Sequence, residues 1–295
     1  MPHTYGGPMT SLETRFVRPP QAVLATLVSR ALTEAGEATD PVDCTWVEHG
    51  SNTVVVLGER TAVRITRQPS GAADLLRTQA LVDALADLPF DLPRSTGDPI
   101  EAEGHIAIPT QRLRGVSDPP DPPDAVVLRD LLEAVHSADL ARLRPHLAPP
   151  RSFFGGEHWQ QVLTDRVVPL LPMDLRDDAL ARIQGLAALP PVPEALNHGD
   201  LGTSNVLWFG GRVSGVLDWD LAAADDPAED VATVATSFRA WDQLAGLIDA
   251  ATVHRAGVFA RIFPLAVVAF AVLGDRPPAE VTRAVARAER GLRAG

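Results

Sequence analysis

The sequence predicts an α+β fold with two lobes, a small N-terminal lobe built on an antiparallel sheet and a larger helical C-terminal lobe. A chain of 295 residues favours two lobes, because single hydrophobic cores stop growing near that size. Runs rich in β-branched residues occur mainly between residues 44 and 113, whereas helical spacing of apolar residues dominates after residue 125. We therefore predict one lobe over residues 1–113 and a second over residues 114–295.

The N-terminal lobe is expected to combine helices with a small sheet. Residues 21–36 have apolar positions three and four residues apart and end in Gly36, which suits an amphipathic helix followed by a glycine cap. Three β-branched runs separated by turn residues span 44–67, a pattern typical of an antiparallel meander. Helical spacing returns over 72–88, and a further strand is predicted from Gly104.

Near the start of the C-terminal lobe lies a loop, "SDPPDPPD" (117–124), that is rich enough in proline and aspartate to be a surface linker. Two short strands are predicted over 205–210 and 212–219, with Gly210-Gly211 at the turn between them. Such a hairpin would bring Asp218 back beside Asn205. The remainder is predicted to be helical over 125–143, 157–170, 174–188, 228–249, 251–273 and 278–293.

Composition excludes several classes of protein. The net charge of −12 argues against a non-specific nucleic-acid binder, which needs a basic face to displace counterions from phosphates. The single cysteine, Cys44, excludes a disulfide framework and a structural zinc site with several thiolates. No residue is lysine, so a Walker-type GxxxxGK[ST] loop is impossible.

The sequence gives no indication of export or of a membrane partner. The N-terminal residues lack an apolar segment of the kind found in signal peptides. The longest apolar stretch, 262–274, is shorter than the roughly 20 residues that a spanning helix needs, and Pro264 interrupts it, so we expect a buried helix. We expect a cytoplasmic protein, and the sequence leaves its oligomeric state open.

Three oxygen-bearing side chains stand out between residues 196 and 220. Asp200 lies in a glycine-containing loop, where a carboxylate can be presented to take a proton from a hydroxyl group. Asn205 and Asp218 offer hard oxygen donors of the kind that Mg²⁺ uses together with substrate phosphates. Taken singly, each residue is as well explained by capping or turn hydrogen bonds. Their order and spacing favour catalysis.

The segment "HGDLGTSN" (198–205), followed by "DWD" (218–220) and "DPAED" (226–230), resembles the signature of the aminoglycoside phosphotransferase family, a kinase-like group. Within it, these motifs most resemble the tuberactinomycin phosphotransferases, such as the viomycin enzyme. Weaker similarity extends from about Trp46 to Phe238. The resemblance implies a protein-kinase-like fold with a nucleotide-binding N-terminal lobe and a catalytic, substrate-binding C-terminal lobe.

The resemblance also implies roles for individual residues. Asp200 is the expected catalytic base, and Asn205 and Asp218 are the expected Mg²⁺ ligands. His198 is expected to brace the catalytic loop, with proton transfer as the alternative, and Asp230 to support that loop from a helix start. The nucleotide is expected to contact Gly50, Ser51 and Asn52 at a turn, Arg64 on the third strand, and the backbone near Gln111 and Leu113.

Two departures from the kinase pattern concern the phosphate clamp. Arg64 occupies the position of the usual phosphate-binding lysine, and it is bulkier than lysine although it keeps the charge. The usual glutamate partner is missing, since the following helix carries Thr78 and Gln79 at the plausible positions. Six carboxylates between Asp218 and Asp230 fit either a solvated rim or a surface that attracts a cationic acceptor.

The expected function is Mg²⁺-dependent transfer of the γ-phosphoryl group of ATP or GTP to a hydroxyl group of an antibiotic, giving resistance. Aminoglycosides, tuberactinomycins and macrolides all remain candidate acceptors. One alternative is a kinase that acts on a small metabolite such as an amino alcohol or sugar. Another, suggested by the missing lysine and glutamate, is a catalytically silent protein that binds nucleotide or sequesters a ligand.

Overall fold

The computed structural model describes residues 16–48, 52–117, 119 and 123–294. These residues form two compact units with separate hydrophobic cores. The first unit runs to Ala72 and includes Thr96–Thr110, and the second comprises Ala73–Ser95 and the chain from Gln111 onward. Residues 118 and 120–122 of the predicted linker lie outside the described residues, and so do residues 49–51, which include Gly50 and Ser51 of the predicted turn.

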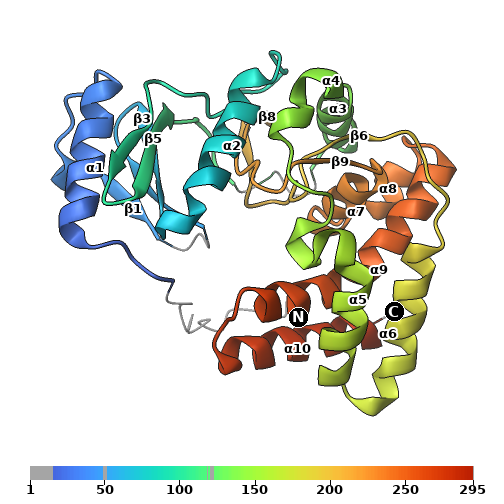
Figure 1. The fold of residues 1–295 in the computed structure, drawn as a ribbon. Coiled ribbons are helices and arrows are strands. Elements are labelled where there is room, and N and C mark those ends of the chain that lie inside the picture. The colour runs from blue at the N-terminus through green and yellow to red at the C-terminus, as the bar shows by residue number, and fades with distance from the viewer. Residues whose placement is uncertain (1–15, 49–51, 118, 120–122, 295) are drawn as a thin grey trace, which may run out of the picture. The chain divides into compact units, whose positions relative to one another are not determined.

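The first unit is an antiparallel sheet covered by a helix, as the sequence predicted (Figure 1). Helix α1 (Gln21–Glu34) buries an apolar face against the sheet and ends where Gly36 takes a positive φ of 64°. The sheet order is β1-β2-β3-β5-β4, with β1 (Thr45–Val47), β2 (Thr53–Leu57), β3 (Thr61–Thr66), β4 (Ile100–Ala102) and β5 (His105–Gln111). The edge strand β4 was not predicted from the sequence, because this strand is only three residues long and is joined to β5 by the two-residue turn Glu103-Gly104.

The turn between β2 and β3 is fixed by the buried carboxylate of Glu37. It accepts hydrogen bonds from the Thr39 hydroxyl at 2.8 Å, from the backbone N–H of Arg60 at 3.0 Å and from the N–H of Glu59. Burial alone would raise the pKa of Glu37, but hydrogen bonds from Thr39, Thr61 and the two amides outweigh it and lower the pKa to about 2. The ionised side chain therefore stabilises this end of the sheet.

Replacing Glu37 with glutamine is expected to lower the free energy of unfolding at pH 7 by about 2–3 kcal/mol. The carboxyl has an ordinary pKa of 4.5 and a folded-state pKa of about 2, so its stabilisation is complete above pH 5 and is lost as the pH falls toward 2. Thermal unfolding of both proteins between pH 7 and pH 3 measures this. The difference between them should shrink with acidification, and a constant difference would contradict the assignment.

The second unit is mainly helical, and several predicted helices are shorter or interrupted in the structure. The segment 125–143 breaks at Ser137, and 228–249 breaks near Arg239, which has a positive φ of 55°. The segment 157–170 mixes 3₁₀ turns with a short α-helix and a π-helical turn, Leu163–Val167. The helices are α2 (Ala72–Ala84), α3 (Ala125–His136), α4 (Leu140–Leu143), α5 (Trp159–Val162), α6 (Met173–Ala187), α7 (Ala228–Ser237), α8 (Trp241–Ala245), α9 (Ala250–Leu273) and α10 (Pro278–Arg293).

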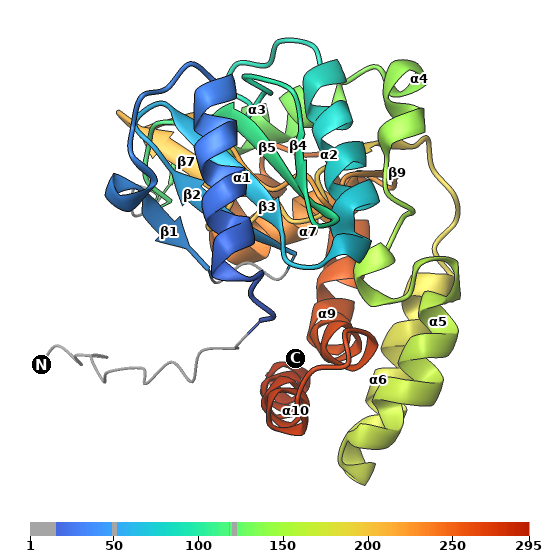
Figure 2. The ribbon, with the colours of Figure 1, turned by 60° about the vertical axis from the view of Figure 1, so that its left-hand side comes forward.

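Helix α9 is, within the described part of the chain, the one helix long and apolar enough to cross a membrane by length and composition alone. It matches the helix predicted over 251–273 and continues through Pro264, so it is longer than the apolar stretch 262–274 that was judged too short to span a membrane. A core helix meets the same criteria, and α9 packs against α6, α7 and α10 (Figure 2). Its buried side chains, including Phe259 and Leu265, contribute to the core of this unit.

Two short antiparallel strand pairs carry the central motifs of the second unit. Strands β6 (Ala195–Asn197) and β9 (Ala223–Asp225) pair with each other, as do β7 (Val206–Phe209) and β8 (Arg212–Val216). The β7–β8 hairpin confirms the prediction, because Gly210 and Gly211 both have positive φ, at 58° and 78°. The loops that follow β6 and β8 hold the predicted catalytic residues.

Candidate active site

The loop after β6 is anchored by the fully buried carboxylate of Asp230. Its Oδ2 accepts the backbone N–H of His198 at 2.7 Å, and its Oδ1 accepts that of Gly199 at 3.0 Å. Asp230 lies in the first turn of α7, where the helix dipole favours a negative charge. Gly199 has a φ of 81°, and a Cβ there would lie 2.7 Å from the carbonyl oxygen of Leu221, so the loop requires glycine.

The imidazole of His198 links this loop to the end of β8. Its Nδ1 accepts the backbone N–H of Asp200 at 3.2 Å, so Nε2 carries the proton and donates to the carbonyl oxygen of Leu217 at 2.8 Å. The ring is fully buried and packs edge-on against Trp219, with 4.7 Å between ring centroids. Because both nitrogens are engaged within the fold, the contacts of His198 are those of a brace.

Asp200 presents an exposed carboxylate at the tip of the loop. The side-chain amide of Asn205 donates to the Asp200 carbonyl oxygen and to Asp200 Oδ2, both at 2.8 Å. The backbone turns tightly between them, since the N–H of Gly202 donates to the Asp200 carbonyl oxygen at 2.8 Å. The amide group of Asn205 is therefore held in one orientation, and both of its hydrogens point at Asp200. Its Oδ1 oxygen is left for a ligand.

The hairpin brings Asp218 to Asn205, as the sequence predicted. Val206 pairs with Val216, and the N–H of Leu217 donates to the carbonyl oxygen of Asn205 at 2.8 Å, so Asp218 follows directly at this point. Asp218 is exposed and has a φ of 58°, a left-handed conformation that is uncommon for residues other than glycine. Asp200, His198, Asn205 and Asp218 are thus gathered in one place.

The oxygens of Asn205 and Asp218 suit a magnesium ion. The oriented amide oxygen of Asn205 and the exposed carboxylate of Asp218 are hard donors on adjacent chain segments. Within the described residues, no group of three or more His, Cys, Asp and Glu side chains is arranged to hold a metal ion. Two protein ligands agree with the habit of Mg²⁺, which takes its other ligands from water and phosphate oxygens.

The residues predicted to contact the nucleotide belong to both units. Gly50 and Ser51 lie outside the described residues. Asn52 is exposed before β2, and its carbonyl oxygen accepts the N–H of Arg67 at 3.1 Å. Arg64 lies on β3 opposite Val55 and is largely buried.

The other two predicted nucleotide contacts are the last residue of β5 and a residue just after that strand. Gln111 is exposed at the end of β5, and its backbone N–H donates to the carbonyl oxygen of Arg94 at 2.8 Å. Leu113 packs against Gly215 of β8.

Thr78 and Gln79, which occupy the positions expected for the missing glutamate, are buried within the second unit. The Gln79 Nε2 atom donates to Asp83 Oδ1 and to the carbonyl oxygen of Pro93, both at 3.1 Å. Both side chains are part of the interior of the second unit, and neither is a carboxylate.

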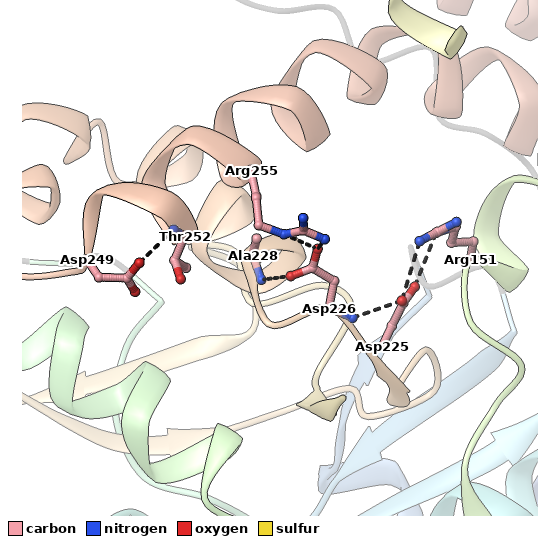
Figure 3. Close-up of polar contacts among 7 residues, drawn as sticks. All are labelled: Arg151, Asp225, Asp226, Ala228, Asp249, Thr252 and Arg255. Carbon is pink, nitrogen blue, oxygen red and sulfur yellow. Dashed lines mark hydrogen bonds and ion pairs between the residues drawn. The ribbon is translucent and has the colours of Figure 1, made fainter. Parts of the chain in front are cut away.

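Several carboxylates after Asp218 have internal partners (Figure 3). Asp225 pairs with Arg151, with 3.2 Å between Oδ2 and Nε. Asp226 pairs with Arg255 and also accepts the N–H of Ala228, the first residue of α7, at 3.0 Å. These contacts support a structural reading of both residues, although the sequence had left a cation-attracting surface open.

Sequence reasoning missed Arg151 and Arg255, which lie 74 and 29 residues from their partners. No local pattern distinguishes either residue from the chain's other arginines.

His136 carries no hydrogen bond at its buried Nε2, which lies 3.7 Å from Asp230 Oδ2.

Glu229 lies in the first turn of α7. In the sequence it follows Asp225 and Asp226 and precedes Asp230. Burial, and then the charges of Asp225 and Asp230, raise its pKa to about 8, although Arg151 opposes them. Glu229 is therefore protonated at neutral pH.

Replacing Glu229 with glutamine is expected to stabilise the protein by about 2–4 kcal/mol at pH 8 and above, and to have little effect at pH 4. Above its ordinary pKa of 4.5 the unfolded chain releases this proton, whereas the folded chain holds it up to about pH 8. Wild-type stability should therefore fall relative to the variant across that window. Chemical denaturation at pH 4 and pH 8 measures the difference, and Glu157→Gln, at an exposed position, is the control.

Comparison with known proteins agrees with these features. Residues 47–261 match the sequence model of the phosphotransferase enzyme family. Viomycin phosphotransferase from Streptomyces vinaceus is 32% identical over 208 residues, which cover 64% of this chain and 69% of that protein. This similarity is of the kind that the motifs predicted.

Solved structures with low sequence identity share the protein-kinase-like fold. The GDP complex of wild-type aminoglycoside 2'-phosphotransferase-IIIa has a TM-score of 0.75 at 16% identity, covering 92% of this chain and 99% of that one. A thermostable mutant of aminoglycoside phosphotransferase APH(4)-Ia, in ternary complex with AMP-PNP and hygromycin B, has a TM-score of 0.64 at 17% identity, covering 90% and 99%. The predicted fold class is thereby confirmed.

Proposed function

Because this chain belongs to the phosphotransferase enzyme family, we propose that it transfers the γ-phosphoryl group of ATP or GTP to a hydroxyl group of a small-molecule antibiotic. The observation that carries the proposal is the arrangement of Asp200, Asn205 and Asp218. An exposed carboxylate lies beside an oriented amide and a second exposed carboxylate. This is the set that phosphoryl transfer requires, since catalysis there depends on positioning and electrostatics.

In the proposed reaction, Asp200 accepts the proton of the acceptor hydroxyl while that oxygen attacks the γ-phosphorus. The bond between the γ-phosphorus and the bridging oxygen breaks, and the nucleoside diphosphate leaves. The hydrogen bond from Asn205 to Oδ2 fixes the carboxylate, so Oδ1 is the oxygen directed to the substrate. General-base action of this kind contributes roughly 10²- to 10⁴-fold to the rate.

Asn205 and Asp218 would hold the magnesium ion through their side-chain oxygens. Bound there, Mg²⁺ would neutralise charge on the phosphate oxygens of the donor. His198 and Asp230 keep both ligand-bearing segments in place, because they tie the loop after β6 to Leu217 and to α7.

We further propose a tuberactinomycin peptide as the first acceptor to test. One relative, at 32% identity, is viomycin phosphotransferase. A protein with the same fold has been solved in a ternary complex with hygromycin B. Aminoglycosides and macrolides are the next candidates.

The direct test incubates the purified chain with Mg²⁺, ATP or GTP, and viomycin, an aminoglycoside or a macrolide, and detects an added phosphate by mass. A phosphorylated antibiotic that depends on Asp200 supports the proposal. Stabilisation by Mg-nucleotide in a thermal-shift assay without a phosphorylated product from any acceptor would instead favour the silent nucleotide-binding reading.

A further inference from the structure

Arg77 on helix α2 joins two distant backbone segments within the second unit. Its guanidinium donates to the carbonyl oxygen of His146 at 3.0 Å and to that of Asp220 at 3.2 Å. The side chain is 24% exposed, so these bonds are partly shielded from water. Asp220 lies 143 residues from Arg77 and two residues after Asp218.

The segments that Arg77 contacts are also joined to each other. The N–H of Ala148 donates to the carbonyl oxygen of Ala222 at 2.8 Å. The N–H of Ala222 in turn donates to the carbonyl oxygen of Trp219 at 3.1 Å. Arg77 therefore lies where the chain near His146 meets the chain that follows Asp218.

Asp218 needs support on both sides because its left-handed conformation is unfavourable for a residue with a side chain. On the N-terminal side, Leu217 is held through its N–H by Asn205 and through its carbonyl by His198. Beneath it, Trp219 is fully buried and donates from Nε1 to the carbonyl oxygen of Val216 at 3.2 Å. On the C-terminal side, Arg77 provides a side-chain contact from a distant helix.

We propose that Arg77 is a positioning residue for Asp218. It acts by holding the backbone carbonyl of Asp220, two residues further along the chain. The planar guanidinium directs two donors at two carbonyl oxygens simultaneously, and lysine cannot reproduce this geometry. The inference rests on the proposed function, since it takes Asp218 as a ligand of the cation. It adds a link from helix α2 to the cation site that does not use the kinase glutamate, which this helix lacks.

The test measures how much Mg²⁺ each variant needs to bind a fluorescent ATP analogue. Arg77→Met is expected to raise the Mg²⁺ concentration for half-maximal nucleotide binding by roughly 10-fold or more, as is typical when a residue behind a metal ligand is lost. Arg77→Lys should give an intermediate value. In the phosphorylation assay, kcat of Arg77→Met should recover at high Mg²⁺, which also shows that the variant is folded.

Two control variants separate positioning from general stability. Asp74→Asn removes the exposed contact to Arg77, 3.7 Å from Nε, and should leave the Mg²⁺ requirement unchanged. Arg94→Met removes an arginine that binds carbonyl oxygens at the other end of α2, including that of Leu85 at 2.9 Å. It should lower the unfolding temperature without raising the Mg²⁺ requirement.

An unchanged Mg²⁺ requirement in Arg77→Met, or an equal rise in Arg94→Met, would overturn the assignment. Failure of the proposed function gives a different result: the wild type would bind Mg-nucleotide but would phosphorylate no acceptor. In that case the binding titration still tests Arg77.

Discussion

Asp200→Asn is expected to lower kcat by about 10²- to 10⁴-fold while leaving Mg-nucleotide binding nearly unchanged. Asparagine keeps the size of the side chain and an oxygen that can accept the hydrogen bond from Asn205, so the loop should retain its conformation. What is lost is the carboxylate that we propose as the proton acceptor. Steady-state kinetics with a phosphorylated acceptor, together with nucleotide titration, measures both quantities.

Asp200→Ala should lose more than Asp200→Asn, because it also removes the oxygen that orients the Asn205 amide. Asp242→Asn, at an exposed position on α8, is the matched control and should be fully active. Turnover at wild-type rates in Asp200→Asn would exclude this carboxylate as the base. Equal loss of nucleotide binding and turnover would show that Asp200 acts on the donor rather than on the acceptor.

Asp218→Gly is expected to lower turnover roughly 10³-fold and to weaken Mg-nucleotide binding by at least roughly 10-fold. The same change should leave the unfolding temperature unchanged or raise it, with a gain of up to about 1 kcal/mol in stability, because glycine adopts a φ of 58° without strain. Loss of activity without loss of stability is the signature of a residue held in a strained conformation for function.

The matched control for Asp218→Gly is Asp275→Gly. Asp275 follows α9 and also has a positive φ, of 47°, so glycine relieves a similar conformation away from the catalytic loop. This control should be stabilised and fully active. If Asp218→Gly instead unfolds the protein, Asp218 is a structural residue, and if it binds Mg-nucleotide normally, it is no cation ligand.

Much of the site could be predicted because its key contacts are local or lie within one hairpin. Asp200 and Asn205 are five residues apart, and a tight loop alone brings them together. Gly210 and Gly211 specify a two-residue turn, and the register of that hairpin then places Asp218 beside Asn205. The three-residue strand β4 was missed for the opposite reason, since so short a segment carries too little pattern.

The sequence by itself determined the two-lobed α+β fold, the hairpin and the order of the three oxygen-bearing residues, since these follow from periodicity and turn chemistry over short distances. Only the tertiary structure decided how that site is supported. It placed Asp230 under two loop amides, gave His198 a partner at each nitrogen, and joined Arg77 to Asp220. An arginine has the same local signature wherever it occurs, and the carbonyl or carboxylate it meets depends on how the whole unit packs.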